Sequence, residues 1–168
     1  MTNLIDISKL AGTGESEMLE FKTSFNIEAI ETLVAFANTY GGKVVIGINH
    51  KNEIIGVKVN EESVQNWINE IKGKTAPPLI PNVNIVPFED KSIVVLDIQE
   101  YPIKPVATRG KYFKRIHNSN HLLSITEVVN LHLQSFNTSW DYHVNNQFKI
   151  NDISLAKVQK SIDVINQS

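Results

Sequence analysis

The chain has 168 residues and a formal net charge of -2 at neutral pH, with 42% hydrophobic and 20% charged residues and no cysteine. This length suits one compact domain, and the composition excludes a fibrous or disordered chain and a polycation that binds nucleic acid over its whole surface. The lack of cysteine excludes disulfides, thiolate zinc sites and cysteine nucleophiles. No apolar run is long enough to cross a bilayer and no secretory pattern begins the chain, so we expect a cytoplasmic protein without a membrane partner.

The first strong pattern is a helix that ends at a pair of glycines. Residues 26–39 have apolar side chains at helical spacing, with Asn26 as a suitable N-cap, and Gly41 and Gly42 follow. Residues 43–48 then read as a buried strand. A phosphate-binding loop has the order strand, glycines, helix, whereas here the carbonyl end of the helix faces the glycines. We therefore interpret the glycine pair as a structural connector.

The segments that follow have apolar residues either at the spacing of a strand or at the spacing of a helix. After a turn we expect a strand at 54–59, an amphipathic helix around 64–71 and an extended, proline-rich connection at 74–82. A hairpin at 83–88 and 92–99, a strand at 112–116 and a helix that starts at the capping box of Ser124 and Glu127 come next. A last helical stripe is formed by Leu155, Val158, Ile162 and Ile165.

An acidic cluster near the N-terminus is the first candidate for chemistry. It contains Glu15, Glu17 and Glu20, and Lys22 follows. Carboxylates that converge can hold a hard cation such as Mg²⁺ or share acid and base roles. Glu15 and Glu20 can meet only if the chain bends between them. The alternative is a solvated strand entrance in which Lys22 pairs with a neighbouring acid.

A basic segment at 101–117 is the second candidate. It contains no acidic residue, Tyr112 and Phe113 are interleaved with its cations, and strand alternation would place Tyr112 and Lys114 on one face and Phe113 and Arg115 on the other. This mixture suits phosphate neutralisation combined with stacking on bases or ribose. The alternative is a positively charged sheet edge that prevents edge-to-edge pairing. The five cations are Lys104, Arg109, Lys111, Lys114 and Arg115.

Several of these stretches together resemble a known family. The sequences ESEMLEFK at 15–22, AFANTYGGKVVIGIN at 35–49, Lys104 with Pro105, and YFKRI at 112–116 before a capped helix are similar to the Alba-like DNA-binding domain shared with the Schlafen proteins. The resemblance covers residues 15–133. It implies an α+β fold, in which a mixed β-sheet is packed by helices in a single Schlafen/Alba-like domain.

The resemblance also implies a domain organisation. We expect the Alba-like domain at 1–137 and a C-terminal linker and helix at 138–168. The stretch SWD at 139–141 is similar to the region where longer bacterial members pass into a further module.

The family's described roles imply a nucleic-acid-binding function. Bacterial members are described as transcriptional regulators or RecG-like helicase-related proteins, so we expect a binding module with DNA favoured over RNA and with no cofactor. The phosphates would be contacted by Lys104, Arg109, Lys111, Lys114 and Arg115, with Tyr112 stacking. An oligomerisation or sensor domain, with a homodimer as partner, stays open as an alternative.

A second alternative comes from the Schlafen proteins, in which a similar lobe carries a metal-dependent endoribonuclease site. Two of its carboxylates correspond to Glu15 and Glu20, which would hold Mg²⁺ or Mn²⁺, and the third acidic position is Asn49 here. An amide supplies no negative charge and takes up no proton, so a divalent ion would be held more weakly than by three carboxylates.

Overall fold

The computed structural model describes residues 7–142 and residue 154, with side chains described for 7–135 and 154. The chain divides into two compact units, Met1–Phe136 and Asn137–Ser168. The expected stripe from Leu155 to Ile165 lies outside the described residues.

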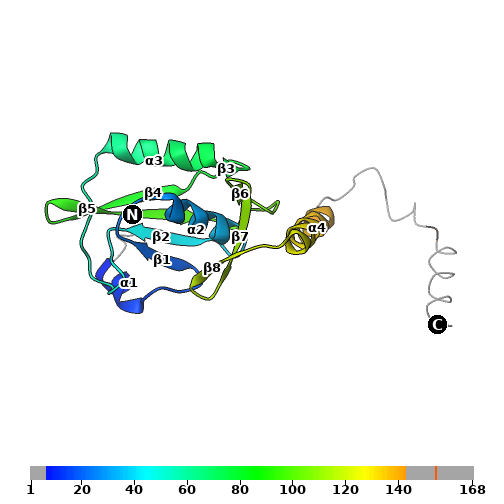
Figure 1. The fold of residues 1–168 in the computed structure, drawn as a ribbon, viewed down its shortest axis with the longest axis horizontal. Coiled ribbons are helices and arrows are strands. Elements are labelled where there is room, and N and C mark those ends of the chain that lie inside the picture. Colours follow the sequence, from blue (N-terminus) through cyan, green and yellow to red (C-terminus); the bar gives the residue numbers. More distant parts are fainter. Residues whose placement is uncertain (1–6, 143–153, 155–168) are drawn as a thin grey trace. The chain divides into compact units, whose positions relative to one another are not determined.

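The larger sheet is mixed and has four strands. Figure 1 labels them β1, β2, β4 and β5. Its order is β1 (Leu19–Lys22), β2 (Gly42–Ile46), β5 (Lys91–Ile98) and β4 (Asn82–Phe88), and only β1 and β2 pair in parallel among the described strands. Most of the side chains of β2 and β5 are fully buried, which explains why both strands read as continuous apolar runs instead of alternating ones. The α+β class and the hairpin of β4 and β5 are confirmed.

Two hydrophobic clusters cover the two faces of this sheet. On one face, Val44 and Leu96 belong to the cluster that contains α2 (Ile27–Ala37) and the buried residues of α3 (Glu61–Lys74). On the other face, Val45 and Val95 pack with α1 (Ile7–Thr13). The alternation of side chains along each strand thus supplies both layers of the core.

Helix α2 begins and ends as the sequence predicts. The Asn26 side chain accepts a hydrogen bond from the Ala29 backbone at 3.2 Å, and the glycines connect the end of α2 to β2. Gly41 has φ of 76°, and a Cβ there would lie 2.8 Å from the Ile98 carbonyl oxygen. Left-handed backbone and close approach both require glycine at this position, so the connector interpretation is confirmed.

A second, smaller sheet packs against α2 and was largely missed by the sequence analysis. Its antiparallel order is β3 (Thr75–Ala76), β6 (Ala107–Thr108), β7 (Lys111–Ile116) and β8 (Ser119–Leu122), and β7 supplies the buried Phe113 to the core. Only β7 was predicted as a strand. The others are short or polar, so no run of alternating apolar residues marks them.

One further expectation needs correction. Residues 54–59 form no regular strand, because Gly56 has φ of 64° and its backbone turns toward Gly47, which leaves single bridges at Ile54 and Val57. The capped helix predicted to start after Ser124 is α4 (Ile125–Tyr142). Within the described residues, no helix is long and apolar enough to cross a membrane.

Candidate functional site

The acidic and basic candidates of the sequence meet in one buried ion pair. Arg115 of β7 donates a hydrogen bond from Nη2 to Glu20 Oε2 of β1 at 2.6 Å, and the two side chains are 1% and 9% exposed. Arg115 also donates to Ser16 O at 3.1 Å and to Asn120 Oδ1 at 2.8 Å, and its guanidinium lies 5.1 Å from the ring centre of Phe36. A buried pair with this many partners ties β7 to β1.

The Asn-Thr pair at the end of α2 anchors the smaller sheet, and the sequence analysis did not identify this role. The buried Asn38 side chain donates to Val106 O at 2.8 Å and to Phe113 O at 2.9 Å, and accepts from Val106 N at 2.7 Å. Thr39 Oγ1 accepts from Arg115 N at 2.9 Å. Two polar residues that directly follow the buried helical run were the signal available in the sequence.

Each of the three predicted metal ligands forms a hydrogen bond or an ion pair with another group of the protein. Glu15 Oε1 accepts from Phe21 N at 3.1 Å, and a tight turn at Ser16–Leu19 bends the chain between Glu15 and Glu20. Glu20 pairs with Arg115 and, at 2.8 Å, with Lys22. Asn49 Oδ1 accepts from the backbone of the turn that follows it, and its amide nitrogen donates to Glu53 at 2.8 Å.

This geometry bears on the metal-site prediction. Two cations already neutralise the Glu20 carboxylate, so a divalent ion would have to displace them. In the part of the chain that the structure describes, no three His, Asp or Glu side chains are placed to hold one ion.

The five cations of the basic segment do not all face solvent with unpaired charges. Arg115 is buried, Lys104 pairs with Glu100 and Lys114 pairs with Glu127. The alternation itself is confirmed, since Phe113 and Arg115 are buried and Tyr112 and Lys114 are half-buried. Arg115 therefore has a structural role, because its guanidinium would have to leave Glu20 before it could contact a phosphate.

The remaining two cations stand at the turn between β6 and β7. Arg109 and Lys111 are exposed, and neither forms an ion pair or a side-chain hydrogen bond with another residue of the described part. Arg109 and Gly110 have φ of 51° and 72° between the paired residues Thr108 and Lys111, the geometry of a two-residue type I′ hairpin turn.

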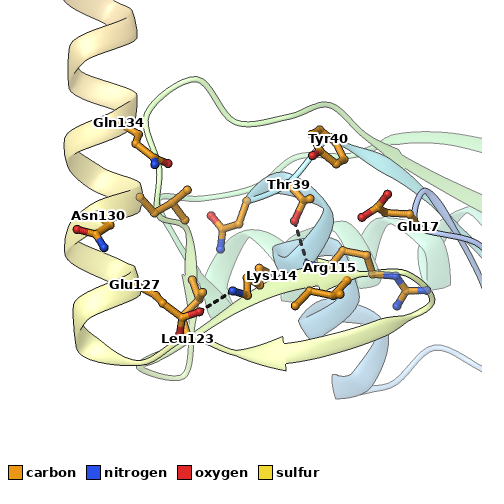
Figure 2. Close-up of a pocket in the computed structure, with 12 residues that line it drawn as sticks. Glu17, Thr39, Tyr40, Lys114, Arg115, Leu123, Glu127, Asn130 and Gln134 are labelled. Carbon is orange, nitrogen blue, oxygen red and sulfur yellow. Dashed lines mark hydrogen bonds and ion pairs between the residues drawn. The ribbon is translucent and has the colours of Figure 1, made fainter.

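A cleft of about 440 Å³ lies between α4, β7 and the end of α2 (Figure 2). Tyr40 and Glu17 lie across it from Asn130 and Gln134 of α4, as Figure 2 shows. The lining residues are Glu17, Asn38, Thr39, Tyr40, Lys114, Arg115, Ile116, Leu123, Glu127, Asn130, Leu131 and Gln134.

Glu127 of the predicted capping box lines this cleft. Glu127 Oε2 accepts from Ser124 N at 2.9 Å and from Ser124 Oγ at 2.8 Å, and its other oxygen pairs with Lys114. Lys114 and then the two Ser124 donors lower the pKa of Glu127 to about 2. Glu127 is therefore a carboxylate throughout the physiological pH range, and it neutralises Lys114.

Solved structures with the same fold support this description. The DIP2311 protein of Corynebacterium diphtheriae superposes with a TM-score of 0.54 at 16% identity, over 68% of this chain and 23% of that chain. The N-terminal domain of a RecG-related protein of Nitrosomonas europaea gives a TM-score of 0.52 at 18% identity, over 74% of this chain and 95% of that domain. At these identities the similarity shows the fold alone, and no curated protein matches the chain.

The family assignment rests on the sequence match. The Schlafen, AlbA_2 family model matches residues 15–124, well over half of the chain. This range contains β1 with Glu20, the end of α2 with Asn38 and Thr39, and β7 with Arg115. The contacts that join these three segments are thus made within the family's own domain, and the chain belongs to the Schlafen AlbA_2 family.

Proposed function

We propose that this domain binds nucleic acid, with DNA favoured over RNA, as part of a transcriptional regulator. The observation that carries the proposal is the pair of exposed cations, Arg109 and Lys111, which have no ion-pair partner within the described residues. Membership of the Schlafen AlbA_2 family supports a nucleic-acid-related role.

The hairpin turn explains how these two cations would act. Arg109 occupies the tip of the tight turn and Lys111 is the first residue of β7, so both project from a short, well-defined backbone. A guanidinium can bind a phosphate with two parallel hydrogen bonds, and a lysine adds a point charge beside it. Tyr112, the next residue along β7, is half-buried and is our candidate for stacking.

Lys104 and Lys114 have a conditional role in this proposal. Each is paired with a glutamate, so each would contact phosphate only by exchanging that partner for the ligand. We assign Arg115 to positioning β7 and not to the ligand. The electrostatic contact is accordingly small, and about two phosphates would be neutralised directly, which predicts a shallow dependence of affinity on salt.

The test compares the turn with equally exposed cations elsewhere. Fluorescence anisotropy would measure affinity for duplex DNA, single-stranded DNA and tRNA over a range of salt concentrations. We expect the double variant Arg109→Ala, Lys111→Ala to bind more weakly and to reduce the salt slope by about two. The matched control is Lys58→Ala, Lys72→Ala, two exposed lysines outside the hairpin, which should leave binding unchanged. Wild-type affinity that does not respond to salt would refute the proposal.

The metal-dependent endoribonuclease is our second candidate. The observation that favours it is the Glu15 carboxylate, which is bound to the backbone of Phe21, the residue after Glu20. Mg²⁺ or Mn²⁺ held by Glu15, Glu20 and Asn49 would supply an activated water, and the Glu20 carboxylate would have to exchange Arg115 for the ion. Purified protein incubated with tRNA and Mn²⁺ tests this. Cleavage lost in Glu15→Gln would support it, and RNA that stays intact would refute it.

A homodimer stays a prediction, which the mass of the protein in solution would check.

A further inference from the structure

The cleft of Figure 2 carries polar groups that the fold does not use. Glu17, Tyr40 and Asn130 line it, and none of them makes a side-chain hydrogen bond or ion pair with any residue in the described part of the chain. Their neighbours Asn38, Thr39 and Arg115 hold β7 through the hydrogen bonds described above. The cleft therefore combines rigid support with unused donors and acceptors, as ligand sites do.

The charges of the cleft disfavour a phosphate inside it. Lys114 is neutralised by Glu127, and Arg115 by Glu20. Glu17 forms no ion pair within the described residues, and the two cations that line the cleft are matched by two acidic side chains, Glu17 and Glu127, so the cleft offers an anion no excess positive charge. A neutral group that donates hydrogen bonds would instead be favoured.

The side chains around Glu17 add the features of a base-binding surface. Tyr40 is 61% exposed and offers an aromatic ring for stacking. Asn130 offers both a donor and an acceptor, and Leu123 and Leu131 supply apolar wall. A carboxylate accepts from the exocyclic amine of cytosine, and an amide side chain pairs with the amine and ring nitrogen of adenine.

The size of the cleft favours the binding of a single base over the binding of a duplex. A volume of about 440 Å³ lies at the lower end of the range for small-ligand sites, about 300 to 1,000 Å³. Stacking on Tyr40 requires a base whose face is free of its own neighbours. We propose that this cleft binds a single unpaired nucleobase with an exocyclic amine, cytosine or adenine, stacked on Tyr40 and held through its amine by Glu17.

This inference rests on the proposed function and adds a base preference to it. The cations at the turn would hold the strand by its phosphates without regard to sequence, and the cleft would select the base. Lys114 lines the cleft and pairs with Glu127, so it would contact the phosphate of that base only by exchanging this partner.

The experiment uses four labelled DNA oligonucleotides of equal length and equal charge: oligo-dC, oligo-dA, oligo-dT and an abasic backbone. We expect oligo-dC and oligo-dA to bind at least about fivefold more tightly than oligo-dT. Tyr40→Ala should weaken oligo-dC binding about 5- to 100-fold without changing the salt slope, and Tyr40→Trp, which keeps a stacking face, should restore it. Glu17→Gln should narrow the preference for dC over dT, whereas Glu62→Gln on α3 should not.

The outcomes separate the base site from the phosphate contacts. If all four oligonucleotides bind with equal affinity and a normal salt slope, or if Tyr40→Ala binds like the wild type, the base site is refuted and the phosphate-binding function stands. If none of them binds even at low salt, the proposed function fails and the base site with it.

Discussion

Glu20 of β1 and Arg115 of β7 face each other inside the domain, although they are 95 residues apart in the sequence. The pair joins the larger sheet to the smaller one, and Arg115 reaches it past the ring of Phe36 on α2. Removing one partner of such a buried pair leaves the other charge uncompensated, which costs more than the pair itself contributes.

We therefore predict that Glu20→Gln lowers the free energy of unfolding by about 3 to 5 kcal/mol. The double variant Glu20→Leu, Arg115→Met should be destabilised less, because it leaves no buried charge. Urea denaturation followed by circular dichroism would measure both. Exposed Glu62→Gln is the control, and a Glu20→Gln variant as stable as this control would contradict the structural role.

Asn38 provides a second stability prediction. Asn38→Ala would leave the amide and carbonyl of Val106 and the carbonyl of Phe113 without the partner that they have now. A buried polar group without a partner costs about 1 to 3 kcal/mol, so we expect a loss of at least about 2 kcal/mol. Asn84→Ala on the exposed side of β4 should change the free energy of unfolding by less than about 0.5 kcal/mol. Equal losses in the two variants would refute the anchoring role.

Two glycines with similar backbone angles should differ in their tolerance of alanine. Gly41 and Gly110 have φ of 76° and 72°, but a Cβ at Gly41 would collide with the Ile98 carbonyl, whereas none of the described atoms lies within 4 Å of one at Gly110. Gly110→Ala should therefore cost only the left-handed strain, about 1 to 2 kcal/mol. Gly41→Ala should cost clearly more, as thermal denaturation of both variants would show.

The lowered pKa of Glu127 predicts that the stability of the folded protein decreases at acidic pH. Its pKa falls from an ordinary value of 4.5 to about 2 because Lys114 and Ser124 bind the carboxylate. A pKa that is lower in the folded state gives a stabilisation that is complete above the unfolded value and disappears as the pH falls through the folded value. The window here runs from about pH 4.5 down to about pH 2.

The measurement is the thermal midpoint of unfolding between pH 2 and pH 7. Glu127→Gln keeps the length of the side chain but not its charge, so it should be less stable than the wild type at pH 7 and converge with it near pH 2. A constant difference across this range would show that the charge of Glu127 does not act as described.

The sequence predicted best what is decided locally. The N-cap at Asn26, the glycine stop at Gly41 and the capping box at Ser124 involve residues a few positions apart, and all three are present. The hairpin of β4 and β5 follows from neighbouring apolar runs. The apolar patterns of the two strands and the turn between them all lie within one short stretch of chain.

The errors concern partners that are distant in the sequence. Nothing near Arg115 indicates that Glu20 will meet it, so a buried structural arginine was indistinguishable from a phosphate ligand. The role of Asn38 depends on backbone groups 68 and 75 residues away. The cleft was not predictable either, because its walls come from α4, β7 and the end of α2, which are separate segments of the sequence.

The position of Lys114 implies that a nucleic acid strand bound in the cleft would affect the start of helix α4. This lysine lines the cleft and also neutralises the glutamate that caps the start of α4. A ligand that withdraws the lysine from that glutamate weakens the cap, and by reciprocity any change that loosens the first turn of α4 alters the grip on the ligand. Nucleic acid bound as proposed would therefore compete with the helix for one ammonium group.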